Sequence, residues 1–276
     1  MDDADDRPLT PAEQALTRLS AARRGPDRLR GWLIGLTIVI FYGVAWHLAG
    51  IDPARLAIGL PRLLHWLAQA WPPNITELPL FVQRTAETVA MAAIGTTFAT
   101  LFAIPMAILA SRNITPLPFL YYPVRWFLNG LRGIDSFVFA LLFVAAVGLG
   151  PFAGVIGICL HSWGSAAKLF ADHIENANLG PFEAVRTAGA GRFGAILYAL
   201  VPDILPVLLS TALYLWEFNI RASTVLGVVG AGGIGLELKN SVDLLDFSRR
   251  FTIIAVILVI VTALDQLSNW LRRQLV

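Results

Sequence analysis

Long apolar stretches alternate with short polar ones along most of this chain, and their lengths match the thickness of a lipid bilayer. A helix of about 20 apolar residues is long enough to cross the hydrocarbon core. The pattern predicts spans at 32–50, 84–110, 126–148, 152–174, 203–225 and 251–271. We therefore expect an all-α, polytopic membrane protein with about six transmembrane helices.

The turn between the third and fourth predicted spans is very short. Only Gly148, Leu149, Gly150 and Pro151 separate the two apolar runs. Backbone polar groups without partners are costly in lipid, so this turn is expected at an interface or inside the protein.

The first 83 residues divide into a polar head and an apolar part. In residues 1–30, the sequence Thr10-Pro11-Ala12-Glu13 has the pattern of a capping box, with proline at the first helical position. This head is either a short amphipathic helix or a loose charged tail, and we place it in the cytoplasm. Residues 31–83 then hold the first transmembrane helix and an outer interfacial segment, and 84–276 form the transmembrane core.

The segment 53–70 is apolar but is interrupted by Pro61, Arg62 and His65. We expect a pair of short helices there, at the outer surface. Aromatic side chains concentrate at the level of the lipid headgroups, where Trp66 and Trp71 are expected to lie.

Charge and composition fix the orientation and exclude several functions. With the N-terminus inside, the inner side carries roughly twice as many basic residues near the spans as the outer side, which places both termini and 176–202 in the cytoplasm. The chain is 56% hydrophobic and 14% charged, and its net charge of +2 gives no reason to expect nucleic-acid binding. The single Cys159 excludes an intrachain disulfide and a cysteine-cluster metal site, and the scattered histidines show no metal-ligand spacing.

A short polar segment at 176–202 lies between two apolar runs. Pro181 near its start and Gly189 further on predict a helix of about two turns. Phe182 and Val185 would share one face of this helix, and Glu183 and Arg186 could pair with another protein.

This segment resembles the EAA loop of binding-protein-dependent ABC importer permeases, which have the type I ABC importer (MetI-like) permease fold. In that family the loop is the cytoplasmic helix that docks into the ATPase subunit. The resemblance implies that this chain is coupled to its ATPase through Glu183, Ala184, Arg186, Gly189 and Pro202. The chain departs from the family pattern by apolar exchanges at Val185, Ala199 and Val201.

The chain contains no GxxxxGK[ST] phosphate loop, so it cannot hydrolyse ATP by that route. We therefore expect a translocation subunit that is not itself an enzyme and binds no cofactor. ATP and Mg²⁺ would be bound by a partner ATPase subunit.

A second glycine-rich stretch follows the fifth predicted span. It matches GxGxxG but follows an apolar helix rather than a buried strand, so it does not indicate a dinucleotide fold. Similar stretches occur in phosphonate-type, methionine and glycine-betaine permeases. The resemblance implies an outer gate or a scaffold for the binding protein, formed by Gly230, Gly232, Gly233 and Gly235.

The region 140–275 resembles the phosphonate-type permeases most closely, through 140–155, 168–175 and 213–235. That resemblance implies a bacterial inner-membrane importer of a phosphorus oxyanion (phosphonate, phosphite or hypophosphite). It also implies ATPase subunits, a periplasmic binding protein and a second permease subunit, identical or paralogous. Asp135-Ser136 stands where the family often has Pro-Glu, which leaves the anion open.

Two other classes stay open at this point. The chain could be an ABC permease for methionine or glycine betaine, or a secondary transporter, although the paired broken helices of the latter are not evident. A membrane-embedded enzyme would need clustered His, Asp or Glu, which the spans do not offer.

Charged residues fall within the predicted spans. Arg132 and Asp135 are three residues apart, and Glu217 and Arg221 are four apart, so each pair can meet on one helix face. Since a charge in the bilayer is costly, these residues either neutralise each other or face water. In the second case the anion path is lined by Arg221 near the outer mouth, with Asn219 and Ser223 nearby.

Overall fold

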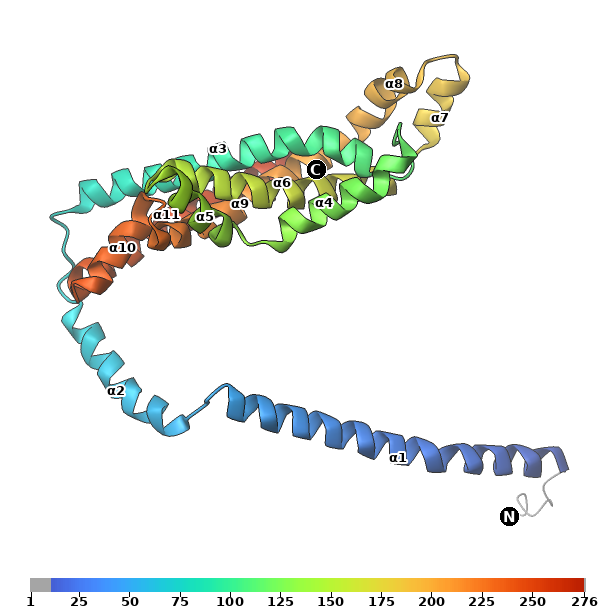
Figure 1. Ribbon diagram of the computed structural model, residues 1–276, viewed down its shortest axis with the longest axis horizontal. Helices are drawn as coiled ribbons and strands as arrows, with labels where there is room; N and C mark the ends of the chain where they lie inside the picture. Colours follow the sequence, from blue (N-terminus) through green and yellow to red (C-terminus); the bar gives the residue numbers. More distant parts are fainter. Residues whose placement is uncertain (1–10, 276) are drawn as a thin grey trace, which may run out of the picture. The chain divides into compact units, whose positions relative to one another are not determined.

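The computed structural model describes the backbone of residues 11–275 and the side chains of residues 30–274. Over this range the chain is helical, with no strand (Figure 1). It divides into two compact units between Leu64 and His65. The all-α prediction is therefore confirmed for the part that the structure describes.

The first unit consists of α1 (Pro11–Leu48) and most of α2 (Pro53–Gln69). The predicted short helix in the polar head is not separate, because α1 runs without interruption for 38 residues into the apolar stretch Arg30–Leu48. Thr10 and the residues before it lie outside the described range. The predicted pair of interfacial helices is also wrong: α2 is one helix, which continues through Pro61. A proline inside a helix removes one backbone hydrogen bond and need not end it.

The second unit is a helical bundle built around α3 (Leu78–Ala110), α6 (Pro151–Asn176) and α9 (Val201–Leu226). Small residues let these helices approach closely. Ala103 and Ala107 of α3 and Ala166, Ala167 and Ala171 of α6 are buried in one cluster. The bundle is completed by α4 (Tyr121–Gly133), α5 (Ser136–Val147), α10 (Gly233–Asp243) and α11 (Phe247–Leu275).

The third predicted span is not one straight helix. The chain bends by 82° between the segments Pro118–Gly133 and Ser136–Val147. Ile134 is extended, and the Asp135 carboxylate caps α5 by accepting the N–H of Phe137 at 2.8 Å. An aspartate at the N-cap satisfies a free backbone donor and favours the start of a new helix. The residue that was expected to be a charge within a span therefore begins a helix.

The number of spans depends on how two elements are counted. Four helical stretches are long and apolar enough to cross a membrane, or five if the bent pair is one span. They are Arg30–Leu48, Leu78–Ala110, Arg192–Val229 and Phe247–Gln274. The predicted count of about six is reached only if α6 is added. This helix is long enough at 26 residues, but it is less apolar because it carries Lys168, Asp172 and Glu175.

Candidate functional site

The predicted coupling helix is present as α7 (Gly180–Thr187), at one end of the bundle (Figure 1). Gly189 follows it with φ = 95°, a left-handed conformation that suits glycine. The N–H of Gly189 donates to the Arg186 carbonyl at 3.0 Å, and the N–H of Ala190 donates to the Val185 carbonyl at 3.3 Å. The expected helix of two turns and its glycine end are thus confirmed.

Packing gives α7 two different faces. Phe182 is buried and Val185 is half-buried, and α7 packs against the segment Arg192–Leu200, while Glu183, Ala184 and Arg186 are exposed. The Arg186 guanidinium lies 5.9 Å from the centre of the Phe182 ring. The buried aromatic side chain anchors the helix, and its polar face is open for contact with another molecule.

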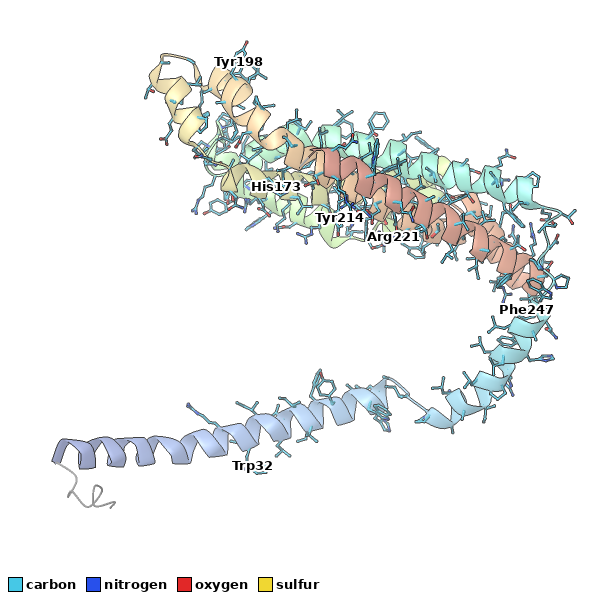
Figure 2. All side chains as sticks on the ribbon, turned by 180° about the vertical axis from the view of Figure 1, so that it is seen from behind. Trp32, His173, Tyr198, Tyr214, Arg221 and Phe247 are labelled. Carbon is cyan, nitrogen blue, oxygen red and sulfur yellow. The ribbon has the colours of Figure 1, made fainter. Side chains whose placement is uncertain are left out.

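A continuous helical path joins this end to the bundle. It consists of α8 (Arg192–Ala195), a π-helical turn (Ile196–Leu200) and α9, in which Pro202 is the second residue. Phe193 and Tyr198 are 78% and 77% exposed on this path, and Figure 2 shows Tyr198 pointing away from the bundle. Neither side chain was a candidate from the sequence. Each is an aromatic residue in the segment 176–202, which the distribution of basic residues places in the cytoplasm, and this combination could have identified both from the sequence.

The first predicted ion pair within a span does not form. Arg132 lies in the last turn of α4 and Asp135 caps α5, so the bend between the two helices separates them. Among the described residues, Arg132 has no carboxylate within ion-pair distance. It is exposed on the surface of the bundle.

The second predicted pair forms and includes a third residue. Glu217 binds Arg221 one turn later on α9 and accepts from Arg272 of α11 at 2.6 Å. The Glu217 side chain is 13% exposed, against 54% for Arg221 and 25% for Arg272. Glu217 lies about 24 Å along α9 from Val201, at ~1.5 Å per residue.

Asn219 and Ser223 are fully buried between helices. Asn219 donates to the Thr96 hydroxyl of α3 at 2.8 Å and to the Ser162 hydroxyl of α6 at 2.8 Å. The Ser223 hydroxyl lies 3.3 Å from the Thr88 carbonyl of α3 and 2.8 Å from the Ile220 carbonyl of its own helix, and it can donate to either. In this chain both side chains therefore join helices, as polar residues do in membrane bundles.

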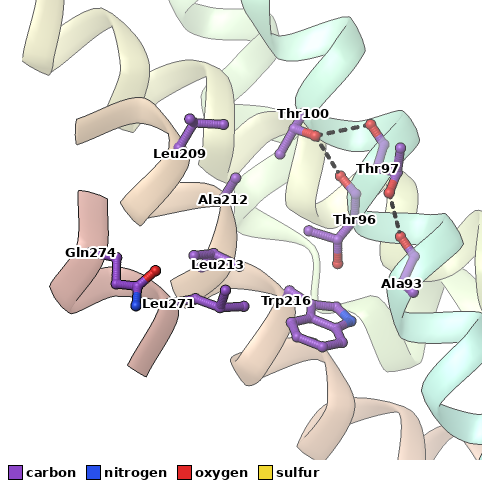
Figure 3. A pocket seen from close by; sticks show the side chains of 10 residues that line it. All are labelled: Ala93, Thr96, Thr97, Thr100, Leu209, Ala212, Leu213, Trp216, Leu271 and Gln274. Carbon is purple, nitrogen blue, oxygen red and sulfur yellow. Dashed lines mark hydrogen bonds between the residues drawn. The ribbon is translucent and has the colours of Figure 1, made fainter. Parts of the chain in front are cut away.

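Two cavities lie on either side of this hydrogen-bonded contact. The first has a volume of about 550 Å³ and lies among α3, α9 and α11 (Figure 3). We call it the threonine cavity, because Thr96, Thr97 and Thr100 line it with Trp216 and apolar side chains. The hydroxyls of these threonines donate to carbonyls of their own helix. The lining contains no charged side chain, so this cavity offers little to an anion.

The second cavity has a volume of about 300 Å³ and lies among α4, α6 and α9. We call it the Arg132 cavity. Its lining combines one arginine, one histidine and three hydroxyl side chains with apolar ones: Arg132, His161, Ser162, Ser165, Leu169, Tyr214, Leu215 and Phe218. Figure 2 shows Tyr214 and Arg221 on α9, in the middle part of the bundle. Arg132 was a candidate from the sequence, whereas His161 and Tyr214 were not, because only the tertiary structure brings them to it.

The glycine-rich stretch packs at the end of the bundle opposite α7 (Figure 1). Gly230, Gly232 and Gly233 have φ values of 90°, 78° and 69°. The Gly230 carbonyl accepts the N–H of Gly150 at 2.9 Å, which satisfies one backbone donor of the turn between α5 and α6. The turn itself is exposed, with Leu149 79% exposed, so of the two expected positions it fits an interface and not the protein interior. The N–H of Ile234 donates to the Thr88 hydroxyl at 2.9 Å.

An ion-pair network borders this stretch and connects three helices. Glu237 of α10 is buried, and its carboxylate lies 2.8 Å from Arg249 of α11 and 3.6 Å from Arg84 of α3. Arg249 also binds Glu77 at 2.9 Å. These contacts hold α10 firmly against the two long helices. In the described part of the chain, no group of His, Cys, Asp and Glu side chains could hold a metal ion.

Comparison with known proteins agrees with this geometry. Residues 99–276 match the family described as binding-protein-dependent transport system inner membrane component. The putative phosphite transport system permease protein HtxC of Stutzerimonas stutzeri is 45% identical over 89% of this chain and 87% of its own. The phosphite transport system permease protein PtxC of the same organism is 38% identical over 88% of this chain and 90% of its own.

The fold also matches a solved structure. The inward-facing MetNI methionine ABC transporter has a chain that aligns with a TM-score of 0.64 and 21% identity, covering 73% of this chain and 98% of that one. This likeness shows the fold, a type I ABC importer (MetI-like) permease fold. The chain belongs to the family of inner-membrane permease components of binding-protein-dependent transport systems.

Proposed function

We propose that this chain is the permease subunit of an ATP-driven importer that carries a phosphorus oxyanion, such as phosphonate, phosphite or hypophosphite, into the cytoplasm. Family membership supports the importer, and the names of the most similar relatives support the cargo. The observation that carries the coupling mechanism is α7, a short helix with a buried anchor and an exposed polar face. ATP and Mg²⁺ are bound by a separate ATPase subunit.

The exposed face of α7 docks into this ATPase. Glu183, Ala184 and Arg186 make the contact, Gly189 ends the helix, and Pro202 begins the helix that receives the motion. The helical path Arg192–Val229 joins the docking end to the region of the two cavities. A rigid-body movement of α7 therefore displaces α9, which is how closure of the ATPase is converted into alternating access.

The remaining partners occupy other surfaces of the bundle. The end with Gly230, Gly232, Gly233 and Gly235 faces the periplasm and receives the binding protein. A second permease subunit, identical or paralogous, closes the path, because Arg132 and Tyr214 are exposed in the single chain. The protein is a multi-pass component of the bacterial inner membrane with both termini in the cytoplasm.

Charge reversal on α7 tests the coupling. In the complex purified with its cognate ATPase subunit, Glu183→Lys should release the ATPase and abolish ATP-dependent uptake, because Glu183 is exposed on the docking face. Asp243→Lys is the matched control, since Asp243 is exposed at the far end of α10. Recovery of the ATPase with Glu183→Lys at the level of the unaltered complex would contradict the docking role.

A further inference from the structure

A polar seam runs between α4 and α6. On α4, Arg125, Asn129 and Arg132 follow at helical spacing and share one face. Two contacts fix their register on α6: Arg125 lies 3.6 Å from Asp172, and the Lys168 ammonium donates to the Asn129 amide oxygen at 2.9 Å. The two helices run in opposite directions, so the next contact along the seam is at Arg132.

The Arg132 cavity is this next contact. His161 and Ser165 lie on the same face of α6 as Lys168, at spacings of four and three residues, and both line the cavity with Arg132. A Cβ atom added to Gly164 would lie 2.7 Å from the backbone nitrogen of Arg132, so the backbones of α4 and α6 touch here. His161 is about 15 Å along α6 from Pro151, at ~1.5 Å per residue, so it lies near the middle of that helix.

The charge at the cavity is not neutralised by the described part of the chain. Asp135 caps α5 and does not reach Arg132, and the partner of Lys168 is a neutral amide. Other basic residues of the bundle differ in this respect. Arg125 binds Glu175 at 2.9 Å, and Arg221 binds Glu217. Since an arginine at membrane depth is not left facing lipid, the exposed face of Arg132 lies toward the path that the second permease subunit closes, where it can meet water or a ligand.

The hydroxyl groups of the cavity can donate hydrogen bonds, whereas the imidazole is oriented differently. The His161 Nδ1 atom is 2.8 Å from the Ile134 carbonyl, which can only accept, so Nδ1 carries the proton and Nε2 of the neutral ring is left as an acceptor. That carbonyl is free because the chain bends there, between α4 and α5. The hydroxyls of Ser165 and Tyr214 have no hydrogen-bond partner among the described residues. The cavity thus combines an arginine with hydroxyl donors and with no carboxylate.

We infer that the Arg132 cavity is a transient binding site for the oxyanion cargo within the permease. The guanidinium of Arg132 supplies the charge, and its planar fork matches two oxygens of a tetrahedral oxyanion. The hydroxyls of Ser165 and Tyr214 supply further donors. The inference rests on the proposed function for the identity of the cargo. The cavity's preference for anions is a separate property that can be measured without transport.

Thiol labelling measures that preference. Ser165→Cys in a Cys159→Ala background places one thiol in the cavity of the full complex. The labelling rate is measured with an anionic and with a cationic methanethiosulfonate. Each rate is divided by the rate at which the same reagent reacts with a free thiol in solution, so that only the effect of the cavity remains. A unit charge about 6 Å from the thiol changes the local concentration of a monovalent ion by a factor that depends on the dielectric constant. The factor is roughly 3 in water and roughly 100 at an effective dielectric constant of ~20. We expect about a 10-fold preference for the anionic reagent, lost with Arg132→Gln.

Phosphite should protect this thiol from the anionic reagent, and sulfate at equal ionic strength serves as the comparison. Equal labelling by both reagents, or a preference that persists with Arg132→Gln, would overturn the inference. If sulfate protects as well as phosphite, the cavity is no site for this cargo, and the inference also fails.

Uptake into proteoliposomes separates this inference from the proposed function. With the unaltered complex transporting phosphite, Arg132→Gln should lower the rate at least about 10-fold, and Arg132→Lys should restore part of it. Arg273→Gln is the matched control, because Arg273 is an exposed arginine of α11 outside the cavity. Unchanged uptake with Arg132→Gln would refute the cavity site alone. Failure of the unaltered complex to move any phosphorus oxyanion would refute the proposed function and leave the labelling result to stand by itself.

Discussion

Glu217 is predicted to hold the end of α11 against α9, and its substitution should be among the most destabilising polar changes in the bundle. Glu217→Gln keeps the shape of the side chain but removes the charge that Arg221 and Arg272 share. Breaking a buried ion pair by removing one partner costs about 3–5 kcal/mol, whereas exposed pairs contribute about 0–1 kcal/mol.

The two arginines are not expected to contribute equally to this cost, because they differ in exposure. Arg221 is 54% exposed and can turn to water, so its share should be below about 1 kcal/mol. Arg272 is 25% exposed and has fewer alternatives, so it should account for about 2 kcal/mol. We therefore expect Glu217→Gln to lower the free energy of unfolding by about 2–3 kcal/mol.

A double-mutant cycle measures the two shares separately. Unfolding of the purified protein in mixed micelles would be followed for Glu217→Gln, Arg272→Gln, Arg221→Gln and the two double variants. The coupling energy of Glu217 with Arg272 should exceed that with Arg221 by about 1 kcal/mol or more. Equal coupling energies, or a coupling with Arg272 below about 0.5 kcal/mol, would refute the assignment of Arg272 as the main partner.

Further predictions concern the backbone and the buried polar contacts. Gly233→Ala should prevent stable folding, because Gly233 has a positive φ and the added methyl group would collide with the Thr88 hydroxyl. This would be seen as loss of the monodisperse peak of the protein in detergent. Gly130→Ala is the control and should be neutral or mildly stabilising, because Gly130 faces open space on α4. Asp135→Ala should lower unfolding stability by about 1 kcal/mol through loss of the α5 cap, and Asp135→Asn should recover most of it; equal losses would argue against capping. Asn219→Leu should cost about 1–3 kcal/mol because it leaves the buried Ser162 hydroxyl without its partner, and an unchanged stability would show that this contact is dispensable.

Local sequence signals predicted the parts of the site that depend on neighbouring residues. Pro181 and Gly189 gave the two ends of α7, since both act through the conformation of their own backbone. The spacing of Glu217 and Arg221 gave their ion pair, since residues four apart meet on any helix. These predictions required no knowledge of the tertiary structure.

Features that depend on distant contacts were missed or assigned differently. The bend at Asp135 was missed because an aspartate within an apolar run looks like a charge in a span, and only its capping bond identifies a helix start. Asn219 was placed beside the anion path because it lies two residues from Arg221, and its hydrogen bonds to α3 and α6 could not be foreseen from the sequence. The pairing of Arg272 with Glu217 joins residues 55 positions apart, which no periodic pattern reveals.

The central claim is that this chain moves a phosphorus oxyanion by ATP hydrolysis on a partner subunit. Proteoliposomes containing this chain, its ATPase subunit and the cognate binding protein offer the most direct test, with radiolabelled phosphite or methylphosphonate as the cargo. We predict uptake only when ATP and Mg²⁺ are present on the ATPase side and the binding protein is on the other. Uptake driven by a proton gradient with this chain alone, or uptake of methionine or glycine betaine but of no phosphorus oxyanion, would contradict the account.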